Sequence, residues 1–208
     1  MQTARAGEAQ PPDAMDLRHE ACLERIAEDS ELAYEEAMIW QSQGGGRRAR
    51  HCVAMTLFAL GHEGEAASRL EKLAVSPDGG NMKLRIGYYA EAADMWLTAQ
   101  EPRKAYGAAT KGLEIARADI ELRIVRARAY SALGRWDYAE TDLTSVLAFS
   151  PHQPRALRYR ADTRLRQGKL ALAKADIDKS VAINESDIDS LLVRGKIIEA
   201  IRLKALKP

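Results

Sequence analysis

Small and apolar residues recur along this chain at helical spacing, and the predicted helices come in pairs. In the stretch "ALGRWDYAETDLTSVLAFSP", Gly134 ends one helix, a second helix follows at once, and Pro151 stops it. Glycine accepts the left-handed backbone that closes a helix, and proline cannot continue one. The pattern therefore predicts a helical hairpin over this stretch.

The same punctuation returns after 34 residues. Gly168 lies 34 residues after Gly134, while Gln100 takes the corresponding place one period earlier. Small residues let two helices approach closely, so this period predicts a series of similar hairpins. The aligned slots hold, in successive periods, Ala93, Ala105 and Ala109; Ala127, Ala139 and Leu143; Ala161, Ala173 and Ile177; and finally Gly195.

A fixed period of 34 residues with two helices in each unit resembles the tetratricopeptide repeat (TPR) family. The resemblance implies an all-α fold: a TPR superhelical solenoid of about five helical hairpins plus a C-terminal capping helix. The solenoid is predicted to span residues 14–208. Its units lie near 14–46, 47–80, 86–119, 120–153 and 154–187, with the capping helix at 188–205.

Two irregular segments flank or interrupt this pattern. Residues 1–13 are polar and carry two prolines, so they predict a disordered lead. About five extra residues around "DGGNMKLR" separate the second unit from the third. The "GGG" run, residues 44–46, is predicted to end the second helix of the first unit.

Composition and charge narrow the function only slightly. The chain is 46% hydrophobic and 29% charged, as is typical of soluble globular proteins, and its formal net charge is +1. That charge gives no general attraction to nucleic acid or to a membrane surface. No apolar run approaches the length of a membrane span. We therefore expect neither nucleic-acid binding nor membrane insertion.

No catalytic, metal-binding or cofactor-binding pattern stands out. The four histidines, His19, His51, His62 and His152, lack zinc-ligand spacing, and solvated or capping roles are the preferred interpretation even for His19 and His51. The "GGG" run lacks the lysine and hydroxyl residue of a phosphate-binding loop. We expect no enzyme, no metal and no cofactor; an accessory domain of an enzyme complex is a less favoured alternative.

The resemblance places Cys22 and Cys52 on the first helices of successive units, where it implies that their sulfurs are neighbours. They form either a disulfide or two buried free thiols. A disulfide would indicate an oxidising compartment. The polar start of the chain also resembles exported TPR proteins of Gram-negative bacteria, with Met1 added. A periplasmic location is therefore predicted, the alternative being a cytoplasmic protein with a native Met1 and reduced thiols.

The resemblance finally implies a groove, walled by first helices, that holds an extended peptide or a partner helix. The arginines there either solvate a helix face or pair with an acidic or C-terminal carboxylate-bearing peptide. The predicted groove residues are Arg128, Arg155, Arg158, Asp162, Arg166 and Lys196, with the more apolar Met55 and Phe58 in the second unit.

Chaperone-binding members of the family use a lysine and two asparagines as a clamp. Those slots hold Arg158, Asp162 and Val193 here, so that clamp is not matched. We expect a non-catalytic protein- or peptide-binding scaffold, or alternatively a cytoplasmic chaperone or adaptor. The residues indicate neither the identity of the partner nor an oligomeric state.

Overall fold

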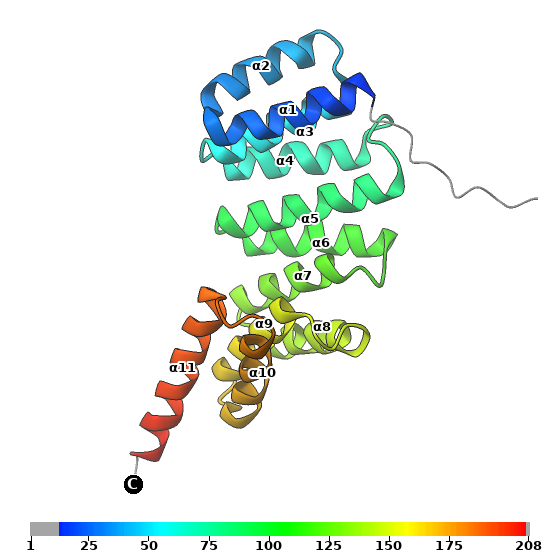
Figure 1. Cartoon of the computed structure of the whole chain (residues 1–208). Helices are drawn as coiled ribbons and strands as arrows, with labels where there is room; N and C mark the ends of the chain where they lie inside the picture. The colour runs from blue at the N-terminus through cyan, green and yellow to red at the C-terminus, as the bar shows by residue number, and fades with distance from the viewer. Residues whose placement is uncertain (1–12, 207–208) are drawn as a thin grey trace, which may run out of the picture. The chain divides into compact units, whose positions relative to one another are not determined.

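The computed structural model describes residues 13–206, and the regular structure in that range is entirely α-helical. Its helices follow one another as five hairpins and a final single helix (Figure 1), which confirms the predicted fold class. The helices are α1 (Ala14–Glu28), α2 (Ser30–Ser42), α3 (Gly46–Ala59), α4 (Glu63–Val75), α5 (Met82–Thr98), α6 (Pro102–Ile115), α7 (Ile120–Ala132), α8 (Trp136–Phe149), α9 (Pro154–Arg166), α10 (Leu170–Ile183) and α11 (Ile188–Ala205).

The predicted disordered lead lies outside the described residues, apart from its last member. Asp13 is ordered and forms the N-cap of α1, where its carboxylate accepts a hydrogen bond from the backbone N–H of Asp16 at 2.7 Å. Such a cap satisfies a backbone donor that has no partner inside the helix. Asp13 therefore belongs to the first hairpin rather than to the lead.

The described chain divides into two compact units, residues 13–80 with α1–α4 and residues 81–206 with α5–α11. The division falls where the 34-residue period is interrupted. The sequence predicts a spacer here and a helix start near Ile86, but α5 begins four residues earlier, at Met82. The reason is local: the Asn81 side chain caps the helix by accepting from the backbone N–H of Leu84 at 3.0 Å.

The turn slots of the second unit share one backbone conformation. Gly134 and Gly168 have φ values of 71° and 74°, and Gln100 adopts 57° at the same place in the preceding hairpin. This left-handed region suits glycine and is disfavoured for a residue with a Cβ. The turn geometry is therefore conserved between hairpins although the glycine is not.

The aligned small slots form the core of each hairpin, as the period predicts. Ala127 and Ala139 lie in one core cluster and Ala161 and Ala173 in the next, and all four are fully buried. Gly195 is the exception among the aligned slots, because it is exposed on α11. Within residues 81–206, each second helix packs on the first helix of its own hairpin and on the next first helix, as α8 does on α7 and α9.

The glycine run between the first two hairpins does more than end a helix. Gly44 is left-handed with a φ of 86°. A Cβ on Gly45 would lie 2.6 Å from both the Trp40 indole nitrogen and the Ala49 Cβ, so only glycine fits there. Gly46 is already the first residue of α3, which begins inside the predicted terminator.

Candidate functional site on the first helices

The first helices of successive hairpins lie side by side within each unit. In residues 81–206, α5 packs against α7, α7 against α9, and α9 against α11; in residues 13–80, α1 packs against α3. Side chains that project from neighbouring first helices therefore meet across each of these contacts. Most of the predicted groove residues lie on these helices.

A pocket of about 330 Å³ opens between α7 and α9. It brings together three of the predicted groove residues with three that the sequence reasoning missed. The Ser131 hydroxyl also lies 3.1 Å from that of Thr163, which ties the two helices together behind it. The lining residues are Arg128, Ser131 and Ala132 from α7, and Tyr159, Asp162 and Arg166 from α9.

Two of the predicted arginines pair with carboxylates one repeat earlier. The Arg128 guanidinium forms a close ion pair with Asp94 on α5, and it lies 5.2 Å from the centre of the Tyr159 ring. Arg155 pairs with Glu121 at 2.6 Å. Both pairs join residues 34 apart, so the spacing of opposite charges at one period was the signal that could have revealed them.

Arg158 holds the start of α11. Its side chain is only 11% exposed, and it lies 2.9 Å from Asp187, the N-cap of α11, and 3.1 Å from Asp189. Burial acts to lower the pKa of Arg158, but a hydrogen bond to Tyr159 and the two carboxylates outweigh it and hold that pKa above its usual value. Hydrogen bonds from Ser190, and then the charge of Arg158, lower the pKa of Asp187.

The remaining predicted groove residues differ in their accessibility. Asp162 and Arg166 form an ion pair at 3.1 Å along α9, with side chains 25% and 55% exposed. Lys196 is exposed on α11. Met55 and Phe58 are half-buried on α3 in the first unit. Of the predicted set, the α7–α9 pocket thus collects only Arg128, Asp162 and Arg166.

A second family of ion pairs lies between the helices of single hairpins. Arg126 donates two hydrogen bonds of 2.8 Å to the buried carboxylate of Asp142, and this interaction raises the pKa of Arg126. One period later, Arg160 makes the same two-bond contact with the buried Asp176. Both carboxylates are fully compensated, so these pairs serve the packing of the hairpins rather than recognition.

In the first unit, α1 and α3 are joined covalently. A disulfide links Cys22 to Cys52, whose Cα atoms lie 6.3 Å apart, within the range that a disulfide can bridge. This confirms the pairing that the resemblance implied. His19 and His51 also meet, with Nε2 and Nδ1 2.9 Å apart and His51 buried, which corrects the preferred interpretation of solvated or capping histidines.

Two searches of the described part of the chain found nothing. Residues 13–206 contain no group of three or more histidine, cysteine, aspartate or glutamate side chains arranged to hold a metal ion. Among the helices of that range, none is long and apolar enough to cross a membrane.

No family model and no curated protein sequence matches this chain. Solved structures do match it. TTC0263, a thermophilic TPR protein of Thermus thermophilus, is similar with a TM-score of 0.66 at 18% identity, over 91% of this chain and 100% of that one. YrrB, described as a TPR protein with an unusual peptide-binding site, gives 0.62 at 17% identity, over 88% and 92%.

A shorter match concerns a peptide complex. The first TPR of Spaghetti (RPAP3), bound to the HSP90 peptide SRMEEVD, gives a TM-score of 0.52 at 22% identity, over 56% of this chain and 93% of that one. At these identities the likeness concerns the fold. The chain therefore has the TPR fold, as the 34-residue period indicates.

Proposed function

We propose that this chain is a non-catalytic scaffold that binds an acidic peptide at the α7–α9 pocket. The observation that carries the proposal is the lining of that pocket, which sets two arginines and a tyrosine around a concave site on the first helices. Two proteins of the same fold are described as binding a peptide or having a peptide-binding site, which supports the proposal. No catalytic role is assigned to any residue.

The pocket suits a carboxylate for a geometric reason. A guanidinium offers five N–H donors, so Arg128 can keep its bond to Asp94 and still donate to a second carboxylate. The Tyr159 ring beside it restrains the guanidinium plane. Arg166 is more exposed than Arg128 and can turn from Asp162 toward a ligand at little cost.

We further propose a periplasmic location. The Cys22–Cys52 disulfide supports it, because such bonds persist in oxidising compartments and are rare in the cytosol. The alternative is a cytoplasmic scaffold in which both thiols are reduced. The redox state of these sulfurs, in protein isolated without reductant, decides between the two.

The peptide proposal is tested with a displayed library of random heptapeptides that carry free C-termini. The wild-type chain is expected to enrich peptides rich in aspartate and glutamate. The double variant Arg128→Gln and Arg166→Gln is expected to weaken capture about tenfold or more, because two charge-assisted contacts are lost. Glutamine is chosen over glutamate to avoid placing a like charge beside Asp94.

The matched control removes two exposed arginines outside the pocket, Arg103→Gln and Arg135→Gln. It should bind as the wild type does, and both variants should keep the wild-type helicity. Enrichment of apolar peptides, or equal capture by the pocket variant, would overturn the proposed site.

A further inference from the structure

The last helix exposes apolar side chains along one side. Ile188, Leu192, Leu203 and Leu206 recur at helical spacing on α11 and at its end, and they are 48–72% exposed. We call these four residues the α11 stripe. A helix that caps a repeat array normally turns a polar face outward. The α11 stripe departs from that rule, and exposed apolar patches mark interaction sites.

The slot at Gly195 shows which kind of element would fit this side of α11. Ala127 and Ala161 occupy the same slot one and two periods earlier, fully buried against the second helices of their hairpins. Gly195 is exposed, and a Cβ there would meet no heavy atom within 4 Å. α11 thus offers a seat where a helix packs in the two preceding hairpins.

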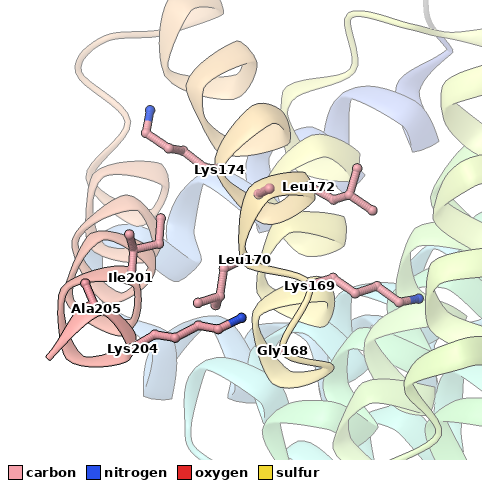
Figure 2. A pocket seen from close by; sticks show the side chains of 9 residues that line it. Gly168, Lys169, Leu170, Leu172, Lys174, Ile201, Lys204 and Ala205 are labelled. Atoms are coloured by element: carbon pink, nitrogen blue, oxygen red, sulfur yellow. The ribbon is translucent and has the colours of Figure 1, made fainter. Parts of the chain in front are cut away.

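A groove of about 750 Å³ opens beside this seat, between the start of α10 and the end of α11. Figure 2 shows Leu170 between the two helices, Ile201 on the α11 side, and Lys204 extending from α11 toward α10. Lys169 and Lys174 also line it. We call it the lysine groove, because it combines apolar walls with three positive charges.

The charges of the lysine groove are only partly compensated. Lys169 lies 2.7 Å from Glu140, and Lys174 lies 2.5 Å from Asp178. Lys204 has no ion pair with any residue from 13 to 206. The groove therefore favours a partner helix that carries negative charge next to apolar side chains.

The first hairpin carries a surface of that description. α2 contains glutamates but neither lysine nor arginine. Its exposed apolar residues are 37–55% accessible and stand among its glutamates. We call this surface the acidic face of α2, and it consists of Glu31, Leu32, Glu35, Glu36, Met38 and Ile39.

We propose that copies of this chain associate head to tail, with the acidic face of α2 in one copy seated on the α11 stripe and lysine groove of the next. Apolar residues would then be buried on both sides, while the glutamates approach the lysines. Because the two surfaces differ, each copy keeps one of them unused after a single contact. Such an interface builds chains or closed rings. It uses no residue of the α7–α9 pocket, so it goes beyond peptide binding.

The test begins with sedimentation velocity on the full chain over a series of protein and salt concentrations. The average mass should rise past that of a dimer as protein concentration increases. It should fall as salt is added, because the charged part of the contact is screened. A wild-type chain that stays monomeric throughout would overturn the proposal.

Two charge-reversal variants then separate the two surfaces. Glu31→Lys with Glu35→Lys alters only the acidic face of α2, and Lys174→Glu with Lys204→Glu alters only the lysine groove. Each variant alone should self-associate at least about tenfold more weakly than the wild type. Mixed in equal amounts, they should form a one-to-one complex and stop there, because each brings one intact surface.

The matched control, Arg103→Glu with Lys179→Glu, reverses two exposed charges outside both surfaces and should assemble like the wild type. Circular dichroism checks that all variants keep their helicity. A dimer that survives both reversals, or a mixture of the two variants that fails to pair, would show that the contact is not head to tail and overturn the proposal.

Discussion

The two compact units fasten their neighbouring first helices by different chemistry. In residues 13–80, α1 and α3 are joined by the Cys22–Cys52 bond, beside the contact between His19 and His51. In residues 81–206, the links between first helices include arginine–carboxylate pairs, such as Arg155 with Glu121. A disulfide restricts the unfolded chain whatever the solvent, whereas an exposed ion pair contributes little and weakens with salt.

The difference follows from the regularity of the repeat. Where the period is a constant 34 residues, a side chain meets its own slot in the next hairpin, so one acidic and one basic substitution make a link. The first unit has no such constancy: its linked positions are 30 residues apart for the cysteines and 32 for the histidines. There a covalent bond holds helices that a repeated slot does not.

The largest expected effect comes from breaking the covalent link. Replacing Cys22 and Cys52 by alanine should lower the free energy of unfolding of the first unit by about 3–4 kcal/mol, because the bond closes a long loop in the unfolded chain. Hydrogen exchange followed by mass spectrometry reports the loss for each unit separately. Intact mass with and without alkylation, on wild-type protein isolated without reductant, first establishes the bond.

Residues 81–206 are the internal control for that experiment. Their exchange protection should stay as in the wild type. Two alkylatable thiols in the wild-type protein, or an equal loss of protection in both units, would contradict the assignment of the staple to the first unit.

A smaller effect is expected from overpacking the regular unit. Ala127→Leu or Ala161→Leu would force a larger side chain into a fully buried slot, and should lower the free energy of unfolding by roughly 1–3 kcal/mol. The matched control is Ala175→Leu, at an exposed position of α10, which should change it by less than about 0.5 kcal/mol. Thermal melts measure all three, and unchanged melting of both core variants would refute the repeat alignment.

The smallest effect concerns acid. The folded-state pKa of Asp187 lies below its ordinary value, so its stabilising contribution is complete above about pH 4 and is lost as the pH falls through the folded value. Asp187→Asn keeps a capping side chain but removes the charge that faces Arg158. The fall in melting temperature between about pH 7 and about pH 3 should therefore be smaller in this variant than in the wild type.

The disulfide of the first unit does not titrate, so its stapling effect should persist over that pH range. If the Asp187→Asn variant and the wild type lose the same number of degrees on acidification, the Arg158–Asp187 link contributes nothing measurable to the second unit.

Local spacing made much of the fold predictable. Ala139 and Ala173 are buried where the 34-residue period places them, and Gly134 and Gly168 turn the chain where it requires. The start of α5 was misplaced, because the Asn81 cap acts through a single side chain and leaves no periodic signal. A period averages over repeats and cannot register such an isolated feature.

The candidate site was harder to predict than the fold. The sequence identified the arginines of the first helices, but it did not separate Arg158, which is buried against the start of α11, from Arg128 and Arg166, which line a pocket. Nor did it single out Tyr159 or the exposed stripe on α11. Each of these distinctions depends on which neighbour covers a side chain, and that neighbour comes from another helix.

The sequence by itself determined the helical hairpins and the residues of their cores, because helix ends and close helix contacts depend on residue type at short and regular spacing. It also indicated the neighbouring cysteines, through the family that the period resembles. Only the tertiary structure decided which charges are paired, which arginines remain accessible, and that Gly195 lies open where Ala127 and Ala161 are buried. The physical reason is that pairing and burial are properties of the space between helices, and no single helix encodes that space.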